Sequence, residues 1–190
     1  MSTRDRMVDA AAQVMRERGL AHATTKEIAK AAGFSEAALY KHFRDKTELF
    51  MAVLAERTPG ELGALLAGLG ERAGHGTVAE TLTEVAHTAI RFYQHNFPMA
   101  AALFAEPTLF AAHRKALGER QAGPHHVSRA VADYLAAEQR LGRIGQAADP
   151  AAAAALLIGA CLQHAFLGHF VDRGQPTASA LVHTLLAGLA

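Results

Sequence analysis

Hydroxyl, imidazole and ammonium side chains lie close together in the stretch between Thr24 and Lys46. Hydroxyl groups donate hydrogen bonds to phosphate oxygens, and lysine adds the positive charge that attracts them. The chain carries no sequence signature of a nucleophile elbow, a phosphate-binding glycine loop, a dinucleotide fingerprint or a metalloprotease helix. These residue types therefore favour a surface that binds a phosphate-bearing partner over a catalytic site.

Capping residues divide this stretch into short helices. Thr24 and Glu27 match a capping box, in which each side chain bonds the backbone N–H of the other residue. Gly33 ends the first short helix, because glycine adopts the left-handed conformation without steric penalty. Ser35 then caps a second helix over residues 36–43. Two short helices joined by a glycine-containing turn predict a helix-turn-helix, whose second member lies in the major groove of DNA.

The helix over 36–43 is too short to be stable in isolation. We expect Leu39 and Phe43 to pack inward, because four residues separate them along the helix. The positions left to face a partner are Ser35, Glu36, Ala37, Tyr40 and Lys41. Asp45 then begins a further helix, whose first N–H groups attract phosphate, and Lys46 adds a formal charge there.

The ordered run from Val8 to Leu54 resembles the DNA-binding domain of the tetracycline-repressor (TetR) family of transcriptional regulators. The matching residues are Ala11-Ala12, Arg18-Gly19, Thr24-Thr25, Glu27-Ile28-Ala29, Ala32-Gly33-Phe34-Ser35, Leu39-Tyr40-Lys41-His42-Phe43, Lys46 and Glu48-Leu49. The match covers about a quarter of the chain, and the remainder agrees in length and helical character only. The resemblance implies an all-α homodimer with a variable C-terminal domain that binds a small effector.

The resemblance also assigns DNA contacts by position. Its phosphate-contacting residues fall on Thr25, Tyr40, His42 and Lys46, and its base-reading face falls on Ser35, Glu36, Ala37 and Lys41. Ala37 and Ala38 depart from the family, where glycine, serine or threonine is frequent. A methyl group can contact a thymine methyl but donates no hydrogen bond, so base readout is expected to depend on Lys41 with Thr25 or Lys26.

Each of these residues has a plainer interpretation. Tyr40 could be a half-buried core aromatic, and Lys41 and Lys46 could be ordinary solvated charges. Glu36 could stabilise the helix N-terminus through the helix dipole instead of reading cytosine. His42 suits packing and phosphate contact equally.

Composition and charge set the class of protein. The chain has 190 residues, a formal net charge of +1 and one cysteine, Cys161, so it forms no intrachain disulfide. The N-terminus lacks the apolar run of a signal peptide, and the longest apolar run, 151–162, is too short to span a bilayer. We expect a cytoplasmic protein without a membrane segment, with a DNA-binding domain over 1–57 and an effector-binding and dimerisation domain over 58–190.

The junction between these domains carries Thr58-Pro59-Gly60-Glu61. Proline inside a helix costs about 3 kcal/mol, so we predict a break or sharp kink here. The break could act as a hinge that transmits effector binding, or it could be a simple domain boundary.

Proline punctuates the rest of the chain in the manner of an all-α bundle. The predicted helices run from Val78 to Asn96, Pro98 to Ala105, Pro107 to Gln121, Pro124 to Leu141 and Pro150 to Asp172, and a last helix starts at Pro176. The stretch 151–170 is apolar nearly all round, with small residues that permit close helix contact. Together with the resemblance, this helix and the last helix favour a dimer interface of two helices per subunit. The alternative is that both helices belong to the core of a monomer.

An effector pocket is expected among apolar side chains with a few polar groups, the usual lining of a small-molecule site. The candidates are Phe92, His95, Phe97, Met99, Leu103, Phe104, Phe110, Phe166, His169 and Phe170. Arg91, Tyr93, Gln94 and Gln163 supply further polar groups. For any one phenylalanine, the alternative is plain core packing.

Histidines gather in the second half of the chain and raise the alternative of a zinc or nickel sensor. His164 and His169 are five residues apart, so they do not stack on one helical face. We therefore expect no metal and no cofactor.

The sequence as a whole predicts a ligand-responsive repressor that binds a palindromic double-stranded DNA operator as a homodimer. The competing functions are an enzyme, which turnover of a substrate would reveal, and an architectural DNA binder, which would bind random DNA as well as its own promoter.

Overall fold

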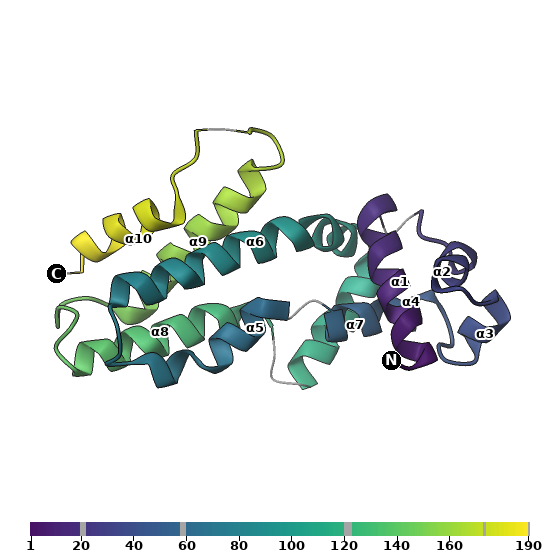
Figure 1. Ribbon diagram of the computed structural model, residues 1–190, viewed down its shortest axis with the longest axis horizontal. Helices are drawn as coiled ribbons and strands as arrows, with labels where there is room; N and C mark the ends of the chain where they lie inside the picture. Colours follow the sequence, from purple (N-terminus) through teal and green to yellow (C-terminus); the bar gives the residue numbers. More distant parts are fainter. Residues whose placement is uncertain (20–21, 58–59, 120–122, 173, 190) are drawn as a thin grey trace. The chain divides into compact units, whose positions relative to one another are not determined.

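The computed structural model describes residues 1–19, 22–57, 60–119, 123–172 and 174–189 (Figure 1). Its elements are α1 Thr3–Arg18, α2 Thr25–Ala32, α3 Glu36–Tyr40, α4 Lys46–Arg57, α5 Gly60–Ala67, the 3₁₀ helix η1 Leu69–Arg72, α6 Val78–Ala105, α7 Pro107–Glu119, α8 His125–Arg140, α9 Pro150–Leu167 and α10 Ala178–Ala187. These described residues form helices and turns without a β-strand, and the all-α prediction is confirmed.

The chain forms two compact units, each with its own core. The first unit comprises Met1–Pro59 and Asn96–Arg120, and the second comprises Gly60–His95 and Gln121–Ala190. The sequence-based division at residues 57 and 58 placed 96–120 in the second domain. In the structure Met99, Leu103 and Leu109 are buried in the core of the first unit instead, because their apolar side chains fall on the side of their helices that packs there.

Four N-terminal helices supply most of the first core. α1 packs against α2 and α4, and Met7, Ile28, Leu39 and Phe50 have no exposed surface. Burying such side chains contributes roughly 1.5–3 kcal/mol each. The Arg4 guanidinium also binds Glu56 through two hydrogen bonds of 2.9 and 2.7 Å. Such exposed pairs contribute less than about 1 kcal/mol, so the apolar core is what holds these helices together.

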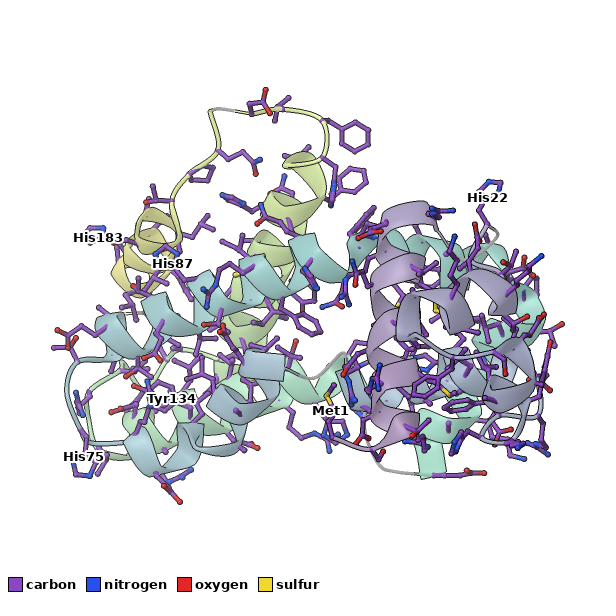
Figure 2. The ribbon with its side chains drawn as sticks, turned by 45° about the vertical axis from the view of Figure 1, so that its right-hand side comes forward. Met1, His22, His75, His87, Tyr134 and His183 are labelled. Carbon is purple, nitrogen blue, oxygen red and sulfur yellow. The ribbon has the colours of Figure 1, made fainter. Side chains whose placement is uncertain are left out.

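The second unit is built on α8 and α9, which pack along each other, with α10 against α9 (Figure 1). Leu82, Val85 and Ala89 place one face of α6 in the same core. Tyr134, labelled in Figure 2, is fully buried there, and burial raises the pKa of its phenol to about 12. Buried Glu138 accepts a hydrogen bond of 3.2 Å from the Gly74 N–H and pairs with Arg143 at 3.2 Å.

The break predicted between Asn96 and Pro98 is wrong, because α6 continues through Pro98 to Ala105. Proline removes one backbone hydrogen bond and costs about 3 kcal/mol inside a helix. Pro98 is exposed, whereas Met99 and Leu103, which follow it, are 4% and 6% exposed. The packing of these two side chains offsets the cost and keeps the helix continuous.

Other predicted helix ends are partly confirmed. α7 and α9 begin at Pro107 and Pro150 as predicted, and Asp149 caps α9 by accepting a 2.9 Å hydrogen bond from the Ala151 N–H. α10 starts at Ala178 instead of Pro176, since Thr177 is its cap. α9 ends at Leu167 instead of Asp172, with Gly168 as its C-cap.

Two predictions cannot be compared with the structure. The predicted break at Thr58 and Pro59 lies outside the described residues, so the hinge stays a prediction. The predicted end of the Pro107 helix at Gln121 also lies outside them.

Candidate nucleic-acid interface

α2 begins with the predicted capping box. The Glu27 N–H donates to Thr24 Oγ1 at 3.2 Å, and the Thr24 N–H donates to Glu27 Oε2 at 3.3 Å. The backbone N–H and the hydroxyl of Thr24 stabilise the charged carboxylate and lower the pKa of Glu27. The first turn of α2, which carries Thr25, is therefore fixed by residues of the turn itself.

The turn between α2 and α3 is held from outside the motif. Gly33 has the left-handed φ of 78° that the sequence predicts. Arg6 of α1 donates from Nη2 to the Ala32 carbonyl at 3.0 Å, and its guanidinium lies 4.7 Å from the Phe34 ring centroid. A Cβ at Gly33 would lie 3.3 Å from the same nitrogen. Sequence reasoning missed Arg6, because its partners Ala32 and Phe34 lie 26 and 28 residues further along the chain.

α3 spans Glu36–Tyr40 and is shorter than the predicted 36–43. The Lys41 and His42 N–H groups bond to carbonyls three residues back, so the last turn tightens beyond Tyr40. Leu39 and Phe43 are 0% and 2% exposed, and their predicted inward packing is confirmed. Packing of these two side chains, rather than helix length, positions the outer face of α3.

α4 begins with Lys46 at a capped N-terminus. The Glu48 N–H donates to Asp45 Oδ1 at 2.8 Å. Glu48 Oε2 accepts 2.7 Å and 3.0 Å hydrogen bonds from the backbone N–H and side-chain Nε of Arg44, and the backbone bond lowers the pKa of Glu48. The ammonium of Lys46 thus lies at the positive end of a helix dipole, an arrangement that suits a phosphate group.

Three of the predicted DNA-binding residues meet between α2 and α3. Thr25 Oγ1 lies 2.5 Å from Glu36 Oε1 and 3.3 Å from the Tyr40 hydroxyl. Tyr40 is 49% exposed, so it is not a core aromatic. The hydrogen bond between Thr25 and Glu36 joins the first residues of α2 and α3 and ties the two helices together.

The other predicted DNA-binding residues also reach the surface. Lys26, Ser35, Ala37, Lys41 and His42 are exposed, and Lys46 is partly exposed. The Ser35 hydroxyl accepts a 3.2 Å hydrogen bond from the Ala38 N–H, which leaves its own proton able to donate. The described surface of α2, α3 and the start of α4 therefore offers hydroxyl and cationic groups, the mixture that contacts a DNA backbone.

The ten predicted effector-binding residues are divided between the two units. Phe97, Met99, Leu103, Phe104 and Phe110 belong to the first unit, and Phe92, His95, Phe166, His169 and Phe170 belong to the second. In the first unit Phe104 is 69% exposed, with its ring centroid 5.1 Å from that of Phe110. In the second unit, Phe166 and Phe170 are 42% and 70% exposed with ring centroids 5.1 Å apart.

A groove of about 880 Å³ lies in the second unit between α5, α6 and α10. Arg91, one of the predicted polar groups, lies in it and donates to Glu61 at 2.6 Å. The other lining residues are Leu65, Ala79, Glu80, Thr83, Glu84, His87, Thr88 and Ser179. None of the ten predicted effector residues lines this groove. The groove lies between three helices that the sequence pattern does not place together.

Histidines of the second unit lie mostly at its surface. His75, His87 and His183 are exposed (Figure 2). Within the described part of the chain, no three His, Cys, Asp or Glu side chains group closely enough to hold a metal ion. His125 and His126 stack with ring centroids 4.3 Å apart but have no third ligand among these residues.

Comparisons with known proteins agree with this geometry. Residues 7–53 match the family described as "Bacterial regulatory proteins, tetR family". The HTH-type transcriptional regulator SrpR of Pseudomonas putida is 46% identical over 55 residues, which are 29% of this chain and 26% of that protein. The chain therefore spans about a quarter of the length of this relative.

Two solved structures share the fold over almost the whole chain. A TetR-family transcriptional regulator from Mesorhizobium loti superposes with a TM-score of 0.78 at 20% identity, covering 98% of this chain and 96% of that one. FadR from Bacillus subtilis, solved in complex with stearoyl-CoA, gives a TM-score of 0.69 at 15% identity, covering 98% and 99%.

Proposed function

Because the chain belongs to the TetR family of transcriptional regulators, we propose that it is a ligand-responsive repressor that binds a palindromic operator as a homodimer. The observation that carries this proposal is the helix-turn-helix of α2 and α3, with the Thr25 and Tyr40 hydroxyls at its surface and Lys46 at the start of α4. In such a motif the second helix enters the major groove and the flanking groups hold the phosphates.

The dimer part of the proposal is supported by α9. This helix is 18 residues long and apolar enough to cross a membrane by length and composition, yet only 33% of it is buried. Its inner face packs on α8, whereas Leu156 and Leu162 remain 67% and 46% exposed. A small apolar groove of about 360 Å³ continues this surface onto α10. We propose that a second copy covers this surface. The resulting dimer would bind two operator half-sites that lie about one DNA turn apart.

The effector part of the proposal is supported by the apolar and aromatic side chains of the second unit, among them Phe92, Phe166 and Phe170. A structure of the same fold, FadR, holds stearoyl-CoA, so the fold accommodates a small-molecule ligand. Effector binding would favour a conformer that no longer matches the operator, provided that the effector binds the two conformers with different affinity. Such a regulator would act in the cytoplasm, where its DNA is.

The test is an anisotropy titration of the purified full-length protein against its own upstream intergenic DNA. Random DNA serves as competitor, and the salt concentration is varied. A repressor is expected to bind its operator at least about a thousandfold more tightly than random DNA. Equal binding to both DNAs would instead indicate an architectural DNA binder.

A further inference from the structure

The hydrogen bonds that join Thr25 of α2 to Glu36 and Tyr40 of α3 have defined donors and acceptors. Thr25 Oγ1 lies 2.5 Å from Glu36 Oε1, and a carboxylate only accepts hydrogen bonds, so Thr25 donates to Glu36. The Thr25 hydroxyl has a single proton, and the Tyr40 hydroxyl, 3.3 Å away, then donates to the Thr25 oxygen. The Thr25 proton is therefore directed at Glu36, and the Tyr40 proton is directed at Thr25.

This arrangement opposes phosphate binding. Phosphate oxygens also only accept hydrogen bonds, so Thr25 can donate to the DNA backbone only after it releases Glu36. A short hydrogen bond from a hydroxyl to a carboxylate is among the stronger ones in proteins. Glu36 is also the single carboxylate among the nine residues predicted to contact DNA, and its charge repels phosphate.

We propose that Glu36 is a specificity-determining residue that couples base readout to phosphate contact. It is the first residue of α3, and the N-terminal residues of a recognition helix contact base edges. The cytosine amino group is the major-groove donor that suits a carboxylate. When cytosine donates to Glu36, the carboxylate keeps a hydrogen-bond donor without Thr25, so the Thr25 hydroxyl can turn and donate to a phosphate.

A DNA site without that cytosine leaves Thr25 donating to Glu36 and places a carboxylate without a base donor against the base edges. Non-cognate DNA is therefore penalised twice, through repulsion and through the missing phosphate contacts. The inference rests on the proposed DNA-binding function and adds to it a base preference and the residue that sets it.

The first test compares selections from a library of random-sequence duplexes by the full-length wild type and by Glu36→Gln. The wild type is expected to enrich half-sites with cytosine at one position, and Glu36→Gln is expected to lose that preference while keeping the others. Glu36→Gln should also bind random duplexes roughly three- to tenfold more tightly. Glu17→Gln removes the same charge from an exposed position of α1 and should leave the base preferences unchanged.

The second test does not depend on the folding of Glu36→Gln. Thr25→Val removes the hydroxyl that, in this proposal, reaches phosphate only at cognate sites. It should weaken binding to the selected duplex several-fold more than binding to random duplexes, so the specificity ratio falls. Lys46→Ala, a plain phosphate contact, should weaken both about equally. Equal losses for Thr25→Val would overturn the coupling.

The outcomes separate this inference from the proposed function. A wild-type selection that enriches no sequence would contradict sequence-specific repression itself. A selected palindrome whose base preferences are the same for the wild type and Glu36→Gln would leave the repressor intact and overturn the role of Glu36.

Discussion

Two side chains on the candidate surface would interact with a phosphate group in different ways. Tyr40 presents a neutral hydroxyl on a half-exposed ring, and Lys46 presents a charge at a helix N-terminus. Tyr40→Phe should weaken operator binding by a few-fold with little change in salt dependence, because no counterion is involved. Lys46→Ala should weaken binding and reduce the slope of log K against log salt by about 1.

Anisotropy titrations at several salt concentrations would check both variants. Lys30→Ala, at the opposite end of α2 from Thr25, serves as a charge-matched control. Unchanged affinity for both Tyr40→Phe and Lys46→Ala would show that these residues do not contact phosphates.

The capping carboxylates give the fold a pH dependence of known sign. The pKa values of Glu27 and Glu48 are lowered from 4.5, chiefly by backbone N–H donors. Groups with a depressed folded pKa stabilise the protein above their unfolded pKa and lose that contribution as the pH falls through the folded value. The urea midpoint should therefore be flat near neutrality and fall below about pH 4.5.

Glu27→Gln provides the check on this pH dependence. Its urea midpoint should be lower at pH 7, and it should decline less steeply in acid than that of the wild type. A parallel decline in both proteins would assign the acid sensitivity to other groups.

At the scale of elements, α9 is the helix whose exposed surface most needs explaining. Leu156→Glu and Leu162→Glu put charges on its exposed apolar positions, where burial against a second copy would leave them unpaired. Each should weaken self-association at least about tenfold, as interface anchors do. Sedimentation velocity would measure this, with Gln163→Glu at an exposed polar position of the same helix as a control.

A result in which both leucine variants sediment as the wild type does would exclude this face as the dimer interface. Unchanged far-UV circular dichroism would show that the variants are still helical.

Local signals explain which elements the sequence could predict. The Thr24 and Glu27 box, the left-handed Gly33 and the start of α9 at Pro150 depend on residues within one helical turn, and all are present. The same logic failed at Pro98, where the packing of neighbouring residues outweighs a local helix breaker. It also overestimated α3, whose end is set by the tight turn into α4.

The candidate site follows the same rule. Sequence comparison placed Thr25, Glu36 and Tyr40 on one surface, but no pattern in the sequence shows that they bond to one another. The sequence pattern also does not predict the burial of Met99 and Leu103 with the N-terminal helices, because this packing joins segments more than forty residues apart.

At the scale of the whole molecule, the first unit is assembled from two separate parts of the chain. Met99→Ala or Leu103→Ala should therefore destabilise the first unit by about 2–5 kcal/mol, although both residues lie far from α3 in sequence. Operator binding should weaken at temperatures where the wild type still binds. Thermal unfolding and titrations across temperature would measure this, with exposed Glu106→Ala as the control. Wild-type stability in both Met99→Ala and Leu103→Ala would contradict this assignment of the core.

The Arg6 contact has a consequence for protein engineering. A chimera that grafts only α2 and α3 onto a related regulator would leave behind the guanidinium that binds the Ala32 carbonyl and covers Phe34. The grafted turn would then keep its own backbone hydrogen bonds but lose its side-chain support from α1. The smallest segment to transplant therefore includes α1, so exchanges of operator preference between regulators of this fold should move Thr3–Arg18 together with α2 and α3.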